Sequence, residues 1–162
     1  MIHLIKNVFT NKQRRKLLKD CQPLIVDMGP QFPGRQTYAE LHLHPDFTSS
    51  MNDILGIVYK EIGLSLVISK SWANWTNGNK KDIAWHIHPS QYSLVYYMKT
   101  FPFFSNGTLF EEPMGFVKAP QNSILVFPAK LRHTAPPSPF PFRFGRYTMA
   151  MDLNIVDWQA YG

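Results

Sequence analysis

The chain has 162 residues, of which 44% are hydrophobic and 17% charged, so it is long enough for one domain and too apolar for a disordered chain. Its single cysteine, Cys21, excludes an internal disulfide and a cysteine-based zinc cluster. No apolar run approaches the roughly 18 residues of a membrane span, the N-terminus does not read as a signal peptide, and the expected location is cytoplasmic.

The first predicted helix begins after Thr10. Thr10 and Gln13 have the spacing of a capping box, which predicts a short helix that ends at about Cys21. The formal net charge is +6, and many of the basic residues lie in or just before this helix. These residues are Lys6, Lys12, Arg14, Arg15, Lys16 and Lys19. We interpret them as the solvated face of one helix, so nucleic acid is not expected as a partner.

A second helix is predicted over residues 51–62, where apolar residues recur at helical spacing. Ser49 or Ser50 is the expected N-cap and Gly63 the expected stop. Residues 22–47, which precede this helix, contain several prolines and are expected to be irregular.

Short strands are predicted after Gly63, because the spacing of apolar residues changes from helical to alternating. A tight turn is expected at Asn77-Gly78. The predicted strands cover residues 64–72, 83–88, 92–99, 108–112, 115–119, 123–128 and 143–154. A series of short strands of this kind is typical of a β-sandwich or jelly roll.

Histidines are the most informative residues. The pattern His-x-His-Pro occurs twice, at His42 and His44 and again at His86 and His88. Positions i and i+2 of a strand point to the same face, so two such imidazoles can share one metal ion. A third ligand has to come from elsewhere, and His133 follows a buried-looking strand.

The position of each pair along the chain favours the second copy. His86 and His88 end a predicted strand, whereas His42 and His44 lie among prolines and are interpreted as surface or loop packing. For the second copy together with His133, the spacing fits a metal site and a set of buried, hydrogen-bonded histidines about equally well.

The last predicted strand carries Arg146 and Thr148 on one face. A planar guanidinium next to a hydroxyl suits the binding of a carboxylate, such as the far end of a metal-chelating dicarboxylate. The alternative is a surface ion pair, which arginines usually make.

About half of the chain, residues 70–154, resembles the small 2-oxoglutarate- and Fe(II)-dependent oxygenases, and in particular a subgroup with a His-x-His-Pro motif. The segments that carry the resemblance are Trp72-Ala73-Asn74, Gly78, His86-Ile87-His88-Pro89, Ser93-Leu94-Val95-Tyr96-Tyr97, Leu109-Phe110-Glu111-Glu112-Pro113, Phe127-Pro128, Leu131-Arg132-His133 and Arg146-Tyr147-Thr148. The resemblance implies a mainly β (α+β) fold, a double-stranded β-helix or jelly roll. A single domain, 1–162, is expected, with residues 1–63 as helical N-terminal support and residues 64–154 as the core.

The same resemblance implies the roles of the site residues. His86 and His133 would be ligands of Fe(II), and His88 would take the position where most of the superfamily has Asp or Glu. Arg146, assisted by Thr148, would bind the C5 carboxylate of 2-oxoglutarate. Asn74 and Tyr97 would line the co-substrate pocket.

The implied activity is that of a dioxygenase that uses O2 and 2-oxoglutarate to hydroxylate an unidentified peptide or small molecule, with release of succinate and CO2. The imidazole of His88 suits iron, zinc and copper alike, so it leaves the identity of the metal open. Glu111 or Glu112 is the alternative source of a carboxylate ligand.

Three other functions fit part of the pattern. The first is a cupin-like three-histidine dioxygenase that needs no 2-oxoglutarate, although Tyr92 and Ser93 stand where cupins usually have a glutamate. The second is a zinc hydrolase, which would need a general acid or base near the metal. The third is a non-catalytic β-sandwich module, which would leave the placement of the histidines and Arg146 unexplained.

Overall fold

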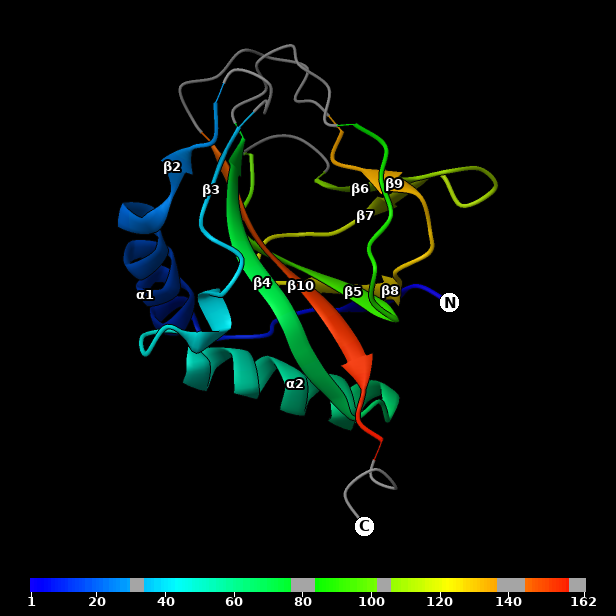
Figure 1. The fold of residues 1–162 in the computed structure, drawn as a ribbon, viewed down its shortest axis with the longest axis horizontal. Coiled ribbons are helices and arrows are strands. Elements are labelled where there is room, and N and C mark those ends of the chain that lie inside the picture. Colours follow the sequence, from blue (N-terminus) through cyan, green and yellow to red (C-terminus); the bar gives the residue numbers. More distant parts are fainter. Residues whose placement is uncertain (30–33, 77–83, 102–105, 137–144, 158–162) are drawn as a thin grey trace.

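The computed structural model describes residues 1–29, 34–76, 84–101, 106–136 and 145–157. Two α-helices and two short 3-10 helices accompany ten strands in these ranges (Figure 1). In chain order they are β1 (His3–Ile5), α1 (Asn11–Cys21), η1 (Gln22–Leu24), β2 (Val26–Asp27), β3 (Arg35–Gln36), η2 (Leu41–Leu43), α2 (Thr48–Ile62), β4 (Leu66–Thr76), β5 (Tyr92–Lys99), β6 (Gly107–Phe110), β7 (Phe116–Lys118), β8 (Ile124–Pro128), β9 (His133–Thr134) and β10 (Arg146–Ile155).

The strands form two antiparallel sheets. The larger sheet has the order β1-β8-β5-β10-β4-β3-β2, and the smaller has the order β7-β6-β9. Figure 1 shows α1 and α2 along the larger sheet, and the smaller sheet on its other side. Two sheets with crossover connections between strands distant in sequence are the arrangement of a jelly roll, so the predicted mainly β fold is confirmed.

Alternation along each strand sends one set of side chains to the helices and the other set into the space between the sheets. The main core lies between the helices and the larger sheet; its buried members include Leu17, Met51, Ile54, Val58, Leu94, Tyr96, Met98, Ile124, Val126, Met149, Met151 and Leu153. A smaller cluster of Tyr97, Phe110, Ala119, Leu125 and Phe127 fills part of the space between the sheets.

Strand β10 shows how this alternation prepares a site. Met149, Met151 and Leu153 are buried in the main core, whereas the side chains of Arg146, Thr148, Ala150 and Asp152 line a cavity between the sheets. The neighbouring strand β4 contributes Trp72 and Asn74 to the same cavity, as the register partners of Ala150 and Thr148. On β10 the outer face is therefore apolar, and the inner face carries the charged and polar side chains of Arg146, Thr148 and Asp152.

The two predicted helices are present. Helix α1 has the predicted capping box, with the hydroxyl of Thr10 accepting from the backbone N–H of Gln13. Helix α2 begins at Thr48, and its N-cap is Phe47 without a side-chain hydrogen bond, so the expected N-cap at Ser49 or Ser50 is wrong. The hydroxyl of Thr48 instead donates to backbone carbonyls of the preceding turn. Gly63 ends α2 in the left-handed conformation, with a φ of 73°.

The predicted strands match the observed strands less closely than the predicted helices match the observed helices. Strand β4 extends to Thr76, beyond the predicted end at residue 72. The strand expected over 83–88 is reduced, in its described part, to an isolated bridge at His86. The turn expected at Asn77-Gly78 lies outside the described residues, as do residues 83, 143 and 144. None of the helices in the described part of the chain is long and apolar enough to span a membrane. The division of the chain into a helical support, residues 1–63, and a core, residues 64–154, stays a prediction.

Candidate metal centre and co-substrate pocket

The imidazoles of His86, His88 and His133 converge at one end of the space between the sheets. One ring nitrogen from each of them lies within 4.8 Å of the others, which is close enough for a shared metal ion. His133 is buried, and His86 and His88 are partly buried. The structure thus brings together the three histidines that sequence spacing singled out.

Backbone pairing explains why two of these residues meet although they are far apart along the chain. The backbone N–H of His86 donates to the carbonyl of His133, and the N–H of His133 donates to the carbonyl of His86, at 3.0 Å each. This reciprocal pair extends the smaller sheet beyond β9 and places the two imidazoles side by side, with ring centroids 4.4 Å apart. His88 is held in turn by its N–H, which donates to the carbonyl of Ala129 at 3.1 Å.

The ring nitrogens have defined partners. The Nδ1 atom of His86 lies 2.8 Å from the carbonyl oxygen of Ala84, and the Nδ1 atom of His133 lies 2.8 Å from that of Leu131. A carbonyl can only accept, so each Nδ1 carries the proton and donates it. The Nε2 atom of each ring is then left with a free lone pair, which is the form that binds a metal.

Burial keeps two of these rings neutral. It lowers the pKa of His86, and it lowers the pKa of His133 to about 4, chiefly because the charged imidazolium would lose its hydration. The two other imidazoles of the cluster lower the pKa of His133 further. At neutral pH these rings are therefore ready to act as ligands without first losing a proton.

His88 differs from the other two because its Nδ1 atom faces a carboxylate. Oδ1 of Asp152 lies 2.9 Å from it, and Asp152 is only 3% exposed. The contact has the length of an ion pair, but Oδ1 of Asp152 lacks a partner with hydrogen-bond geometry among the described residues. Asp152 was not among the site residues predicted from the sequence. Continuing the alternation of Arg146 and Thr148 along the predicted strand would have placed it on the same face.

The histidine cluster opens into a cavity of about 630 Å³ between the two sheets. The predicted co-substrate residues Arg146, Thr148, Asn74 and Tyr97 all line this cavity. Tyr97 is buried, and its hydroxyl is hydrogen-bonded to that of Thr108. A cavity of this size is within the usual range for small-molecule sites.

Arg146 is the most unusual group in the cavity. It is 5% exposed, burial lowers the pKa of its guanidinium, and no carboxylate in the described part of the chain pairs with it. Its Nε atom is buried without a hydrogen-bond partner, while its Cζ atom lies 5.9 Å from the centre of the Phe101 ring. A buried cation without an anion is costly, and a bound carboxylate in the cavity would supply the missing charge. The site therefore fits a dicarboxylate such as 2-oxoglutarate.

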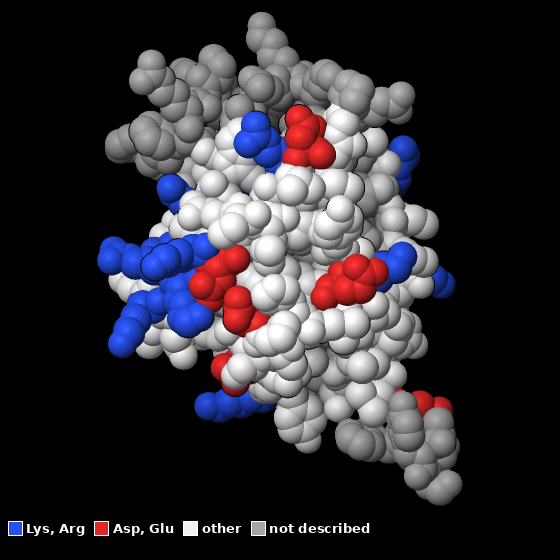
Figure 2. All heavy atoms as spheres, turned by 60° about the vertical axis from the view of Figure 1, so that its left-hand side comes forward, with Lys and Arg blue, Asp and Glu red and all other residues white. Residues whose placement is uncertain are grey.

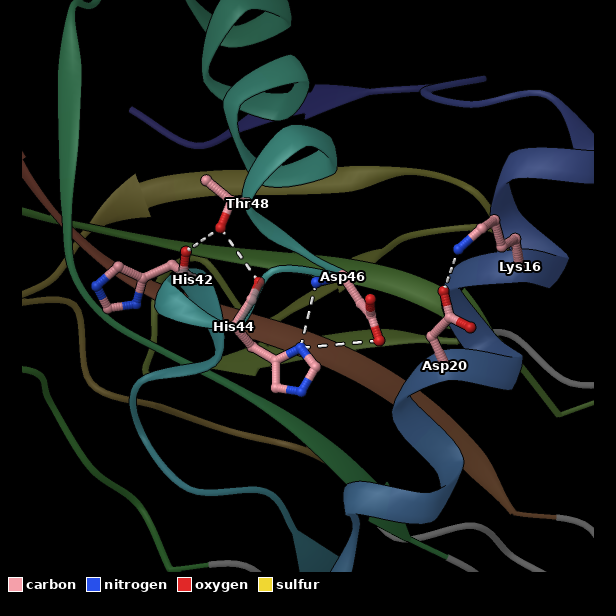
Figure 3. Close-up of polar contacts among 6 residues, drawn as sticks. All are labelled: Lys16, Asp20, His42, His44, Asp46 and Thr48. Carbon is pink, nitrogen blue, oxygen red and sulfur yellow. Dashed lines mark hydrogen bonds and ion pairs between the residues drawn. The ribbon is translucent and has the colours of Figure 1, made fainter.

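The first His-x-His-Pro copy is used for a structural purpose (Figure 3). The backbone N–H of His42 donates to the hydroxyl of Ser71, and the ring Nδ1 of His42 lies 2.8 Å from the same hydroxyl. The Nδ1 atom of His44 accepts from the backbone N–H of Asp46 at 3.2 Å. Both residues therefore shape the turn before α2, and neither is in the metal-binding group found among the described residues.

Two other groups of charged residues lie outside the cluster. Glu111 faces Arg132 at 3.6 Å on the surface, and neither Glu111 nor Glu112 is in the metal-binding group.

Figure 2 shows basic side chains gathered on one side of the molecule with acidic side chains directly beside them. Arg14 is an exception to the predicted solvated face of α1. It is buried, and its guanidinium donates to the carbonyl of Met98 at 3.0 Å.

Comparisons with known proteins identify the fold. No family model matches the chain, and no curated protein matches its sequence. Among solved structures, the α-ketoglutarate-dependent epimerase SnoN from nogalamycin biosynthesis superposes with a TM-score of 0.72 at 11% identity, over 94% of this chain and 76% of SnoN. HygX from Streptomyces hygroscopicus, solved with nickel and 2-oxoglutarate, gives 0.67 at 12% identity, over 94% and 82%. The collagen prolyl hydroxylase vCPH of Paramecium Bursaria Chlorella virus-1, solved with 2-oxoglutarate, gives 0.61 at 11% identity, over 94% of both chains.

The chain therefore has the fold of the 2-oxoglutarate-dependent oxygenases, as the sequence resemblance implied, and the double-stranded β-helix is confirmed. The match extends through the N-terminal region, whereas the sequence motifs began at residue 70.

Proposed function

We propose that the protein is an Fe(II)- and 2-oxoglutarate-dependent dioxygenase. The observation that carries this proposal is that two features line the same cavity. One is a group of three imidazoles with nitrogens within 4.8 Å of one another. The other is a buried guanidinium without a carboxylate partner among the described residues. The first feature suits a divalent metal and the second suits an anion. A 2-oxoglutarate molecule needs both, because one end chelates the metal and the other is a free carboxylate.

His86, His88 and His133 would hold the metal. Imidazole nitrogen is a good ligand for iron, and three ligands on one side leave open positions for a co-substrate and oxygen. Bound Fe(II) supplies the activation of O2, coupled to the oxidative decarboxylation of 2-oxoglutarate to succinate and CO2. His88 stands where most of the superfamily has a carboxylate, so the ligand set itself is neutral.

Arg146 would bind the C5 carboxylate of 2-oxoglutarate through its guanidinium, with Thr148 donating a hydroxyl from two residues further along the same face. Tyr97 and Asn74 would line the same pocket. The buried surroundings keep water away from this ion pair, so each hydrogen bond to the carboxylate is stronger than it would be at the surface.

The fold comparisons support the proposal because the neighbours with the same architecture use this co-substrate. HygX has been solved with nickel, 2-oxoglutarate and hygromycin B, and vCPH is a collagen prolyl hydroxylase in complex with 2-oxoglutarate. We infer that the reaction here is the hydroxylation of a peptide or a small molecule, in a cytoplasmic setting.

The test begins with metal content. Protein purified without oxygen and loaded with Fe(II) should bind about one equivalent and, once oxygen and 2-oxoglutarate are added, form succinate. His133→Ala should lose the metal and the succinate while keeping the β-sheet signal in circular dichroism. His42→Ala, a matched change in the other His-x-His-Pro copy, should keep both. Protein that binds zinc and ignores 2-oxoglutarate would instead be the zinc-binding jelly roll, and stoichiometric iron in His133→Ala would refute the ligand assignment.

A further inference from the structure

Asp152 is buried beside the proposed metal site but is not among the clustered histidines that could hold the ion. Its Oδ1 atom lies 2.9 Å from Nδ1 of His88, which is the length of an ion pair, and it has no other polar partner among the described residues. No lysine or arginine of the described residues pairs with it, and its register partner on β4, Lys70, is exposed. A carboxylate that is 3% exposed needs a compensating charge or donor.

The three imidazoles differ in what holds their orientation. His86 and His133 each donate from Nδ1 to a carbonyl two residues earlier in their own segment. No such local partner of His88 is found among the residues that the structure describes. Its Nδ1 atom faces Asp152, which comes from a different strand. The orientation of His88 therefore depends on tertiary structure, whereas that of the other two is built into their own loops.

Ring stacking fixes only part of the orientation of His88. The rings of Trp72 and His133 stack on it, with centroids 5.7 Å and 5.2 Å away and interplanar angles of 29° and 19°. Stacking holds the plane of the imidazole but does not distinguish the two positions related by a half-turn about the Cβ–Cγ bond, which exchange the nitrogens with ring carbons. One of them turns Nδ1 toward Asp152 and leaves Nε2 for a metal; the other turns a carbon toward the carboxylate. The acceptor oxygen of Asp152 selects the first.

The carboxylate also supplies charge. In the His-x-Asp and His-x-Glu sites of the superfamily one ligand is anionic, whereas His86, His88 and His133 bind a metal as neutral rings. Asp152 places one negative charge directly behind His88, so the metal, its ligands and Asp152 together carry the same net charge as a site with a carboxylate ligand. Hydrogen bonds from a ligating imidazole to a carboxylate raise the basicity of the ligand nitrogen.

We propose, on the basis of the metal site inferred above, that Asp152 is a positioning residue for the metal centre. It holds His88 in the tautomer that carries its proton on Nδ1, it directs Nε2 toward the metal, and it returns to the site the negative charge that the three-imidazole ligand set lacks. Asp152 itself does not ligate the metal.

Metal affinity tests this assignment without any turnover. Co(II), titrated alone into the apoprotein, reports binding by its visible absorption. Asp152→Asn keeps an acceptor oxygen but removes the charge, and should weaken Co(II) about tenfold; Asp152→Leu removes both and should weaken it about 100-fold. Asp46→Asn is the matched control, because Asp46 lies beside His44 in the other His-x-His-Pro copy, at 3.9 Å on the surface. It should leave the affinity for Co(II) unchanged.

Nitrogen NMR of the labelled wild-type apoprotein tests the orientation directly and needs no variant to fold. His88 should carry a proton on Nδ1, and the Asp152→Leu protein should show a mixture of tautomers. A wild-type His88 protonated only on Nε2 would overturn the proposal, as would Asp152 variants that bind Co(II) within twofold of the wild type. Complete loss of Co(II) in Asp152→Asn, as in His133→Ala, would make Asp152 a ligand and also overturn it. Wild-type protein that binds no Co(II) would refute the metal site itself.

Discussion

Replacing Arg146 by methionine should affect stability and co-substrate binding in opposite directions. Met keeps the unbranched apolar stem of the side chain and removes the guanidinium, which is 5% exposed and faces no carboxylate among the described residues. The change therefore removes a buried charge without opening a large cavity. A structural arginine would behave differently, because its loss would break favourable contacts.

The expected magnitudes follow from the burial of Arg146. Exchanging buried ionic groups for apolar ones of similar volume often stabilises a protein by about 1–4 kcal/mol, so the Arg146→Met apoprotein should gain stability within that range. Removing one partner of a buried ion pair costs about 3–5 kcal/mol, so the dissociation constant of 2-oxoglutarate should rise roughly 10²- to 10⁴-fold. Metal affinity should not change.

Two measurements on the same samples separate these effects. Urea unfolding of the apoprotein gives the change in stability, and thermal unfolding with Ni(II) and increasing 2-oxoglutarate gives the affinity. At 100 times the dissociation constant, 2-oxoglutarate stabilises the wild type by about 2.7 kcal/mol, or roughly 5–10 °C for a chain of this size. The variant should show a shift of at most about 1–2 °C at that concentration, because a dissociation constant raised 100-fold or more leaves about 0.4 kcal/mol of stabilisation or less. Arg15→Met, at an exposed arginine of α1, is the control and should leave both measurements nearly unchanged.

An Arg146→Met protein that is less stable than the wild type and still binds 2-oxoglutarate would refute this reasoning. It would show that the guanidinium stabilises the fold through the aromatic ring of Phe101 and that another group binds the carboxylate. Equal losses of metal and 2-oxoglutarate affinity would also point to a structural role.

Three further predictions address other parts of the molecule. Because burial lowers the pKa of His133 to about 4 from 6.5, the unfolded chain takes up a proton before the folded one does as the pH falls. The contribution of His133 to the stability of the metal-free protein should therefore be complete above pH 6.5 and be lost toward pH 4. Urea unfolding of His133→Asn across this range should show a loss of stability smaller by on the order of 3 kcal/mol. Tyr97→Phe should weaken 2-oxoglutarate binding roughly 10- to 100-fold in the thermal assay with little effect on metal affinity, since a hydrogen bond to a charged group contributes about 1.5–3 kcal/mol. An unchanged affinity would show that the Tyr97 hydroxyl does not bind 2-oxoglutarate. Thr10→Ala should destabilise the protein by about 1 kcal/mol in urea unfolding, because it removes the capping box of α1, and Thr10→Ser should restore most of that loss.

Local patterns predicted the parts of the structure that depend on local interactions. The capping box of Thr10 and Gln13 marks the start of α1 because both partners lie within one turn. Gly63 marks the end of α2 because the left-handed conformation favours glycine. The predicted strand over 92–99 coincides with β5, whose residues face the helices and the space between the sheets alternately.

Elements defined by distant partners could not be predicted in this way. Strand β1 has only three residues, His3–Ile5, and it exists because it pairs with β8, which lies far along the chain. The second His-x-His-Pro copy shows the same limit. The interpretation of His86 and His88 as neighbours on a regular strand gave the correct cluster for an incomplete reason, since the segment is held by backbone hydrogen bonds to His133 and Ala129.

Asp152 shows another limit of prediction from sequence patterns. Its position on the inner face of β10 follows from the alternation that already selected Arg146 and Thr148. Its proximity to His88 does not follow from either segment alone, because it depends on how the loop after His86 meets the far end of β10. Sequence patterns therefore identify which residues share a face, and tertiary structure decides which of them form a site.

The inner face of β10 links ligand binding to stability. Arg146 and Asp152 are both buried, they have opposite charges, and Thr148 and Ala150 lie between them on the same face, so the two ions do not pair with each other. In the described part of the chain neither faces a lysine, arginine, aspartate or glutamate of opposite charge, and an unbalanced charge in a desolvated position costs several kcal/mol. A cation at the histidines offsets the charge of Asp152, and a carboxylate at the other end offsets that of Arg146. A metal-chelating dicarboxylate joins the two, so metal and 2-oxoglutarate should each bind more tightly in the presence of the other, and the doubly loaded protein should be the most stable form.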